Sequence, residues 1–226
     1  MSMIEVQINN EETHEYVSGI TVGDILLNVY GKRSGAVAAN IDGKQRDMSF
    51  IVNKNCKIEP ILGDSEEGLY ILRHSCAHLL AQAVVEMFPE AKPTIGPPIE
   101  HGVYYDFHMN PIGDNDLKNI EKRMNQLVRE NITIQREEYD NNELRELFKE
   151  NKFKIEIMDE KVGNEVGSTA YRQGDFVDLC RGPHVPSTSH LRWFKLTSTS
   201  QAYWRADRNR EPLTRIYGMC YASKEG

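Results

Sequence analysis

Residues 66–88 constrain the fold of this chain most strongly, because they read as one long helix bounded at both ends. The polar segment 63–68 precedes the pattern and offers Ser65 or Asp64 as a cap for the first helical amides. Pro89 ends the pattern, since proline cannot continue a helix. The apolar positions on one side of this predicted helix are Leu72, Cys76, Leu79, Leu80, Ala83, Val84 and Met87.

Two histidines project from the opposite side of the predicted helix. His74 and His78 stand four residues apart, so their rings are neighbours, and the small side chains beside them leave room for a ligand. The residues between them are Ser-Cys-Ala, without the glutamate that a zinc protease uses as its base, which excludes that class. Two solvated helix histidines remain the alternative interpretation of this pair.

A cysteine and a third histidine lie in the segment 175–184. Phe176, Asp178 and Cys180 share one face of a predicted strand, and the Arg-Gly-Pro turn after it returns His184 close to Cys180. With the histidine pair, these groups could ligate zinc tetrahedrally. They could also line a metal-free cleft where water attacks a carbonyl, or include a Cys–His nucleophile pair. No residue that would orient such a nucleophile pair is evident.

The segment 153–158 is predicted to be a strand. Its alternation places Phe153, Ile155 and Ile157 on a buried face and Lys154, Glu156 and Met158 on the other.

Two further helices are predicted as scaffold. Asp140 or Asn141 would cap the shorter one, at 142–149. The longer one carries an apolar stripe formed by Leu117, Ile120, Met124, Leu127 and Val128.

The first part of the chain predicts a small α+β unit with the order ββαβββ. Thr21 is a plausible cap for its helix, and Asp42-Gly43 is a strong signal for a two-residue hairpin. One helix packed on a mixed sheet is expected, and no reactive residue stands out. The predicted strands are 4–8, 14–17, 36–41, 46–52 and 57–62, with the helix at 24–29.

Composition restricts the class of protein. With 226 residues, 39% of them hydrophobic and 27% charged, the chain can bury a core in one large or two smaller domains. No apolar run approaches the roughly 18 residues of a membrane helix, and the first residues lack the pattern of a secretory signal. Four scattered cysteines are typical of reduced thiols, so we expect a cytoplasmic protein.

Charge is distributed unevenly along the chain. The net charge is −7, yet residues 181–226 carry 8 basic and 3 acidic side chains, a net of +5. Basic and aromatic residues together suit phosphates and exposed bases, whereas an ordinary solvated strand is an equally good interpretation. Within this segment, arginines 192, 205, 208, 210 and 215 are interleaved with Trp193, Phe194, Tyr203, Trp204 and Tyr217.

Several ordered motifs together resemble the editing region of bacterial-type threonyl-tRNA synthetases. They are the segments 71–80, 95–106, 177–184, 202–207 and 215–218. The first 63 residues resemble the TGS domain, a ubiquitin-like β-grasp module. Alanyl-tRNA synthetases and free-standing alanyl-tRNA editing proteins share the His-x3-His and Cys-x3-His pattern, but not a TGS domain in front of it.

The resemblance implies an α+β fold in two domains. Residues 1–63 would form the TGS (β-grasp) domain, and residues 64–226 a larger editing domain of the threonyl/alanyl-tRNA synthetase type. It also implies proofreading, in which the ester of mischarged Ser-tRNA(Thr) is hydrolysed and Thr-tRNA(Thr) is spared. No length remains for an ATP-dependent synthetic core, so we expect this chain to deacylate tRNA but not to charge it.

The resemblance also implies roles for individual residues. His74 and Lys154 would position or deprotonate the attacking water, the lysine acting as a base only if burial or a nearby cation lowers its pKa. His78, Cys180 and His184 would shape a small side-chain pocket.

Substrate binding is expected from a second group of residues. Asp178 would hold the aminoacyl ammonium, while Tyr104, Tyr105 and the turn that begins with Gly96 and Pro97 would border the terminal adenosine. Arg181 completes the predicted substrate-binding set.

The expected partners are the acceptor end of tRNA(Thr) and the rest of a synthetase, without a membrane. No cofactor is expected for hydrolysis, because threonyl-type sites are understood to work without metal, and ATP would serve only the missing core. One rival interpretation is a zinc-dependent alanyl-type deacylase, with zinc at the three histidines and Cys180. The other is a non-catalytic RNA-binding or regulatory module.

Overall fold

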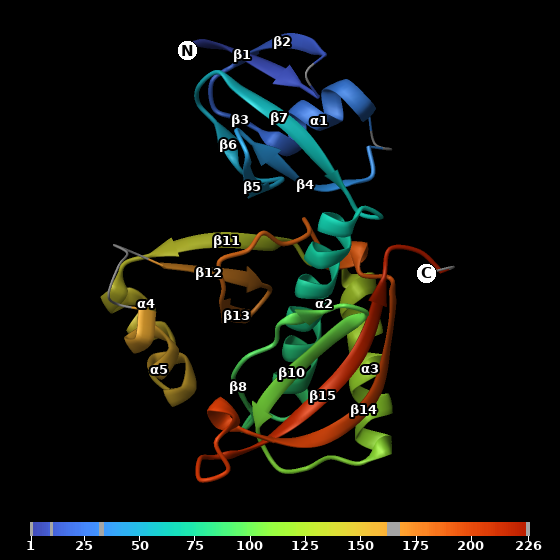
Figure 1. The fold of residues 1–226 in the computed structure, drawn as a ribbon, viewed down its shortest axis with the longest axis vertical. Coiled ribbons are helices and arrows are strands. Elements are labelled where there is room, and N and C mark those ends of the chain that lie inside the picture. The colour runs from blue at the N-terminus through green and yellow to red at the C-terminus, as the bar shows by residue number, and fades with distance from the viewer. Residues whose placement is uncertain (1, 10, 32–33, 162–167, 225–226) are drawn as a thin grey trace.

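A computed structural model describes residues 2–9, 11–31, 34–161 and 168–224. Its elements form a small five-stranded sheet with one helix at the N-terminal end, and a larger assembly built around the long helix α2 (Figure 1). Within the described residues, no helix is long and apolar enough to cross a membrane.

The N-terminal sheet is mixed and has the strand order β2-β1-β7-β4-β5. Strands β1 and β7 are parallel, and the other neighbours are antiparallel. Helix α1 (Val22–Tyr30) buries Ile25 and Leu26 in the same apolar cluster as Val6 and Ile58 of the sheet. The strands are β1 (Met3–Ile8), β2 (Glu12–Val17), β4 (Ala36–Ile41), β5 (Lys44–Asp47) and β7 (Cys56–Leu62).

Local signals in this unit are confirmed. The Thr21 side chain accepts a hydrogen bond from the Asp24 amide at 3.1 Å and caps α1. Asp42 and Gly43 both adopt positive φ, of 48° and 79°, as the hairpin between β4 and β5 requires.

The prediction of one strand at 46–52 is wrong, because these residues belong to two separate strands. Strand β5 ends at Asp47, and β6 (Ile51–Val52) pairs instead with β3 (Ile20–Thr21). The chain turns between them because the carbonyls of Met48 and Phe50 accept from the Gly23 and Val22 amides at the start of α1. Those carbonyls therefore satisfy helix amides that have no partner within the helix.

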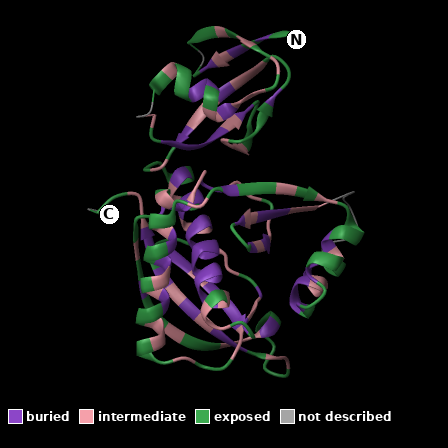
Figure 2. Cartoon of the chain, turned by 180° about the vertical axis from the view of Figure 1, so that it is seen from behind, coloured by how far each residue is buried: buried purple, intermediate pink, exposed green. Residues whose placement is uncertain are grey.

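Helix α2 (Glu66–Met87) is the centre of the larger assembly. The Ser65 side chain caps it by accepting from the Gly68 amide, and it ends immediately before Phe88 and Pro89. The predicted helix is confirmed, but its apolar contacts are not limited to one side. Buried positions surround most of its length (Figure 2) and include Ile71, Ala77, His78, Ala81 and Gln82.

A second sheet covers α2. Its strand order is β14-β15-β10-β8, with β9 pairing β10. Helices α2 and α3 (Asp114–Glu130) pack together against one face of this sheet, and α3 buries the predicted Ile120, Met124 and Leu127. The strands are β8 (Lys92–Pro93), β9 (Pro98–Ile99), β10 (Gly102–His108), β14 (Trp193–Tyr203) and β15 (Pro212–Tyr221).

A three-stranded antiparallel sheet and two short helices complete the fold. The sheet has the order β11-β12-β13, and Asp140 caps α4 by accepting from two of its first amides, as predicted. Short 3-10 turns lie at Thr188–His190 and Trp204–Ala206. The elements are β11 (Ile134–Tyr139), β12 (Ser168–Gln173), β13 (Phe176–Leu179), α4 (Asn141–Leu147) and α5 (Lys152–Lys161).

The predicted strand at 153–158 is wrong, because these residues form α5. The Asn151 side chain accepts from the amides of Phe153 and Lys154 and so begins the helix. Phe153, Lys154, Ile157 and Met158 are all buried, a spacing of i, i+1, i+4 and i+5 that suits a helix. The alternation of Phe, Ile and Ile concealed this second pattern.

Candidate functional site

The three histidines and Cys180 meet between α2 and the end of β13. Ligand atoms of His74, His78, Cys180 and His184 all lie within 4.8 Å of one another. Cys180 Sγ is 3.2 Å from His74 Nε2 and 3.2 Å from His184 Nε2. The structure therefore brings together both halves of the pattern found in the sequence, with the turn at 181–183 returning His184 to Cys180 as expected.

The contacts behind the cluster fix the orientation of His184. Its Nδ1 lies 2.9 Å from the hydroxyl of Ser75, and that hydroxyl oxygen accepts from the Val185 amide. Its backbone N–H donates to Asp47 Oδ1 at 2.9 Å. Since one ring nitrogen is engaged by Ser75, the other faces Cys180.

A second group of polar side chains lies beside the histidines. Lys154 Nζ is 2.5 Å from Asp178 Oδ1, and the Tyr105 hydroxyl donates to Asp178 Oδ2 at 2.5 Å. His78 Nε2 lies 3.7 Å from the same Oδ2. Lys154 and Asp178 are only 3% and 2% exposed, so this is a buried ion pair. Lys154 thus reaches the site from a helix rather than from the strand predicted.

The position of Lys154 is fixed by the start of α5 and by the segment around β8. Its ammonium donates to the Thr94 carbonyl at 2.8 Å and to the Tyr105 hydroxyl at 3.1 Å. The side-chain amide of Asn151, the residue immediately before α5, also donates to the Pro93 carbonyl. The ammonium therefore has oxygen partners from three segments, as a buried cation requires.

Burial holds the histidines in their neutral forms. Loss of solvent lowers the pKa of His74 to about 4 and that of His78 to about 3, although the Asp178 carboxylate opposes both shifts. Burial, and then the two neighbouring histidines, also lower the pKa of His184. At neutral pH, each of these imidazoles therefore has one N–H donor and one nitrogen that can accept a proton.

Burial also keeps Cys180 in its thiol form. It raises the pKa of Cys180 to about 12, against the hydrogen bond from the Gly182 amide. A thiol protonated at neutral pH is a poor nucleophile in the absence of metal. Burial alone would raise the pKa of Asp178, but Lys154 and His78 outweigh it, so the net shift is downward and Asp178 is a carboxylate.

A pocket of about 310 Å³ opens over these groups. Among the predicted site residues, His74, His78, Lys154, Cys180, Asp178, Tyr105, Gly96 and Pro97 line it. The structure brings His184 to the cluster behind the pocket wall, whereas Tyr104 and Arg181 are not among the lining residues.

The two predicted tyrosines face opposite ways on β10. The ring of Tyr105 is buried, stacks on Phe107 and adjoins Gly96, where a Cβ would lie 2.1 Å from a ring carbon. The Arg215 guanidinium lies instead over the ring of Tyr104, with the guanidinium carbon 3.9 Å from the ring centre. A glycine at position 96 is therefore needed for Tyr105 to reach Asp178.

Sequence reasoning missed several lining residues, among them Tyr70, Thr94 and Glu160, whereas it named Arg205 as part of the basic C-terminal strip. Tyr70 stands one helical turn before His74, and that spacing could have indicated it. Thr94 participates through its backbone carbonyl, for which the sequence carries no signal. Tyr70 is 57% exposed and lies at the rim of the pocket.

The basic C-terminal strip is largely paired with acidic side chains. Arg205 contacts Glu160, Arg210 donates to Glu156, and Arg215 donates twice to Asp106. These ion pairs offset part of the positive charge of the strip, and its interpretation as a nucleic-acid surface stays a prediction.

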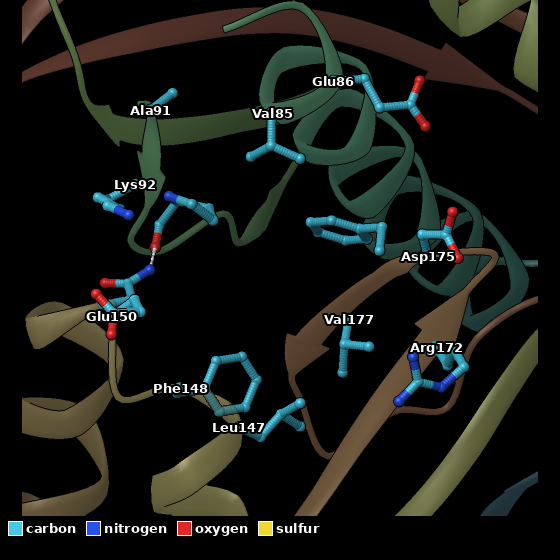
Figure 3. A pocket seen from close by; sticks show the side chains of 13 residues that line it. Val85, Glu86, Ala91, Lys92, Leu147, Phe148, Glu150, Arg172, Asp175 and Val177 are labelled. Carbon is cyan, nitrogen blue, oxygen red and sulfur yellow. Dashed lines mark hydrogen bonds between the residues drawn. The ribbon is translucent and has the colours of Figure 1, made fainter. Parts of the chain in front are cut away.

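A second pocket, of about 440 Å³, lies between α2, α4 and the sheet of β12 and β13 (Figure 3). Apolar side chains such as Val85, Phe148 and Val177 surround it, and Arg172 at its edge donates to Glu137. It contains no cluster of nucleophilic or metal-binding groups among the described residues, so the first pocket is the candidate site.

Part of the site region is similar to a known class of domain. Residues 169–217 match the family described as "Threonyl and Alanyl tRNA synthetase second additional domain". This match includes Asp178, Cys180 and His184, together with the arginines 205, 210 and 215.

The curated relatives that the chain resembles are threonine--tRNA ligases. The chain is 42% identical over 226 residues to the threonine--tRNA ligase of Rubrobacter xylanophilus, covering 99% of this chain and 35% of that protein. It is 43% identical to that of Pelobacter propionicus, over 100% of this chain and 36% of the relative. It is 46% identical to the threonine--tRNA ligase of Thermoplasma volcanium, over 84% of this chain and 28% of that protein.

The chain spans about a third of the length of the first two of these relatives. The matches support the prediction of an editing region of threonine--tRNA ligase, the region that contains the second additional domain. The expected mixed α and β architecture is also present. The identity of residues 1–63 as a TGS domain stays a prediction.

Proposed function

We propose that this chain hydrolyses Ser-tRNA(Thr) at the ester to the terminal adenosine and spares Thr-tRNA(Thr). The observation that carries this proposal is the pocket whose wall includes both a neutral His74 and the buried Lys154–Asp178 pair. The proposal includes the division into a TGS domain at 1–63 and an editing domain at 64–226. tRNA and the remainder of a synthetase are its partners.

The reaction needs a base, a place for negative charge and a means of holding the aminoacyl group. Neutral His74 takes a proton from water as the water oxygen bonds to the ester carbon. The positive charge of Lys154 stabilises the resulting oxyanion. The bond from carbon to the ribose oxygen then breaks, and that oxygen takes the proton. Serine and a free tRNA 3′ end are the products.

Asp178 and the histidine cluster account for binding and selectivity in this proposal. Asp178 is the carboxylate on the pocket wall that an aminoacyl ammonium meets. His78 and Cys180 line the same pocket and limit the space for the side chain. One methyl group changes the binding free energy by only about 1–3 kcal/mol, so a synthetic site also attaches some serine to the tRNA. A second site that excludes the threonine methyl corrects that error.

The same cluster gives the zinc-dependent alternative a physical basis. His74, His78, Cys180 and His184 offer one sulfur and three nitrogen donors, a set that zinc accepts. Bound there, zinc would deprotonate the thiol and polarise nearby groups. If all four side chains were ligands, no position would remain for a catalytic water, so we propose hydrolysis without metal.

The test is hydrolysis of Ser-tRNA(Thr) and Thr-tRNA(Thr) by the wild type, His74→Ala and a matched control, His101→Ala. His101 is an exposed histidine outside the pocket lining. Each reaction is run with and without a chelator. We expect chelator-resistant loss of the seryl ester alone, unchanged in His101→Ala and reduced at least about a hundredfold in His74→Ala.

Other outcomes discriminate between the alternatives. Activity that falls with the chelator and returns with zinc, above all on seryl-tRNA(Ala), would support the alanyl-type deacylase. Binding of tRNA without hydrolysis of either ester would leave an RNA-binding module and overturn the proposal.

A further inference from the structure

One carboxylate of the N-terminal sheet reaches the back of the candidate site. Asp47 is the last residue of β5, and its Oδ1 accepts from the backbone N–H of His184 at 2.9 Å. Its Oδ2 accepts from the Tyr171 hydroxyl at 2.8 Å. Both partners are distant in sequence and belong to the sheet and turn that carry the cluster.

Tyr171 forms a wall for the turn between Cys180 and His184. It lies on β12, paired with Asp178 on β13, and its ring centre is 4.4 Å from that of His184. A Cβ on Gly182 would lie 1.8 Å from the Tyr171 hydroxyl, so the turn passes directly against that oxygen. The Gly182 amide in turn donates to Cys180 Sγ at 3.3 Å. The position of the hydroxyl therefore limits where the turn can lie.

His184 is held at both its backbone and its ring. Ser75 engages ring Nδ1, and Asp47 accepts from the backbone N–H. The remaining ring nitrogen lies 3.2 Å from Cys180 Sγ. Of the two anchors, only Asp47 comes from the first 63 residues, so the geometry of the cluster depends on the N-terminal sheet.

We propose that Asp47 is a positioning residue for the candidate site, which holds the turn 181–184 so that Cys180 and His184 face His74. This inference rests on the hydrolytic function proposed above. Asp47 touches no reacting atom and acts through Tyr171 and the backbone of His184. A buried donor that loses its acceptor carries an energetic penalty, which the turn relieves by moving. Small displacements of a catalytic group reduce rates strongly.

The chain offers a conservative variant and a matched control. Asp47→Asn keeps an oxygen for the His184 N–H, and the Tyr171 hydroxyl can rotate to accept from the new amide. Asp47→Ala removes both acceptors. Asn40→Ala breaks another contact of the N-terminal sheet, the 3.2 Å hydrogen bond to Glu67 on α2, without touching the turn.

The first measurement is kcat and KM for Ser-tRNA(Thr) hydrolysis, with the thermal midpoint of each variant. We expect Asp47→Ala to lower kcat about tenfold or more with little change in KM, because the cluster is displaced while the tRNA contacts remain. Asp47→Asn is expected within about threefold of the wild type, and Asn40→Ala unchanged. Tyr171→Phe, which removes only the hydroxyl, is expected between them.

The second measurement does not depend on hydrolysis. Alkylation of Cys180 by iodoacetamide is followed by peptide mass spectrometry, with Cys76 and Cys220 as buried internal references. Release of the turn exposes the thiol, so we expect Asp47→Ala to increase the Cys180 rate about tenfold or more, and Asn40→Ala to leave it unchanged. The reference thiols report global unfolding if they react in parallel.

The outcomes separate this inference from the proposed function. Suppose that Cys180 is alkylated faster in Asp47→Ala than in the wild type, and that the wild type hydrolyses neither ester. The first result would support the positioning role, and the second would overturn the hydrolytic proposal. An Asp47→Ala protein with wild-type kcat and wild-type Cys180 reactivity would overturn the positioning role. If Asp47→Ala does not fold, equal kcat and alkylation in Tyr171→Phe and the wild type would overturn it as well.

Discussion

The Lys154 ammonium lies 2.5 Å from the Asp178 carboxylate, and both side chains are almost completely excluded from solvent. One residue comes from α5 and the other from β13. Each compensates the desolvation of the other, so the pair joins two separate elements at the pocket wall. The Lys154–Asp178 ion pair therefore contributes to the stability of the fold and also supplies two of the groups that we propose for hydrolysis.

Replacement of Lys154 should destabilise the fold and should also abolish hydrolysis. Lys154→Met leaves the Asp178 carboxylate buried without its cation, and breaking a buried pair in this way costs about 3–5 kcal/mol. We expect this loss in the free energy of unfolding by urea, together with loss of seryl-ester hydrolysis. The double variant Lys154→Met/Asp178→Asn should recover most of the stability but none of the activity.

Lys149→Met is the matched control for that experiment, because Lys149 forms an exposed ion pair with Glu146. It should leave both stability and hydrolysis unchanged. A Lys154→Met protein as stable as the wild type would contradict the buried ion pair.

The pH dependence of hydrolysis should identify the base. A base must be deprotonated to act, and burial lowers the pKa of His74 to about 4. We therefore expect kcat/KM for Ser-tRNA(Thr) to be nearly constant from pH 7.5 down to about 5.5. An unperturbed histidine, with a pKa of about 6.5, would reduce the rate about tenfold at the lower value. A rate that falls in that manner would exclude His74 in its buried state as the base.

The buried histidines should also make stability depend on pH. The pKa of His78 is about 3 in the folded chain and about 6.5 when unfolded, so below pH 6.5 the unfolded state binds more protons. The stabilisation is complete above pH 6.5 and is lost as pH falls towards the folded value. Between pH 7 and pH 5 this loss is about 2 kcal/mol for one such histidine.

His78→Gln should remove that contribution. We expect its urea midpoint to fall less steeply than that of the wild type between pH 7 and pH 5, while the exposed His101→Gln protein follows the wild type. Parallel curves for all three proteins would show that His78 is not buried in its neutral form.

The sequence predicted the parts of this site that depend on local patterns. Helix α2 was predictable because Ser65, Pro89 and the apolar spacing all indicate it, and the i, i+4 spacing then places His74 beside His78. The turn at 181–183 was predictable because a glycine and a proline stand between Cys180 and His184.

The parts that depend on distant contacts were not predictable. Residues 153–158 satisfy both a strand and a helix pattern, and the deciding contact is the Asn151 side chain at the first amides. The carbonyl of Thr94 and the carboxylate of Asp47 reach the site through the fold of other segments, and nothing in their local sequence indicates this. Tertiary contact, rather than propensity, decides these positions.

Gly96 tests the packing of the pocket wall without altering any polar group. A Cβ at this position would lie 2.1 Å from the Tyr105 ring, and that ring must move for an alanine to fit. Because the Tyr105 hydroxyl bonds both Asp178 and Lys154, its displacement should disturb the ion pair. We expect Gly96→Ala to lower stability by about 1–3 kcal/mol and kcat for the seryl ester by about tenfold or more. Gly113→Ala is the control for kcat, since no atom lies within 4 Å of a Cβ there and the residue has a φ of −95°. Because Gly113 is the N-cap of α3, this variant is expected to lose about 1 kcal/mol of stability or less while kcat stays unchanged. Full activity in Gly96→Ala would mean that Tyr105 does not need its observed position for catalysis.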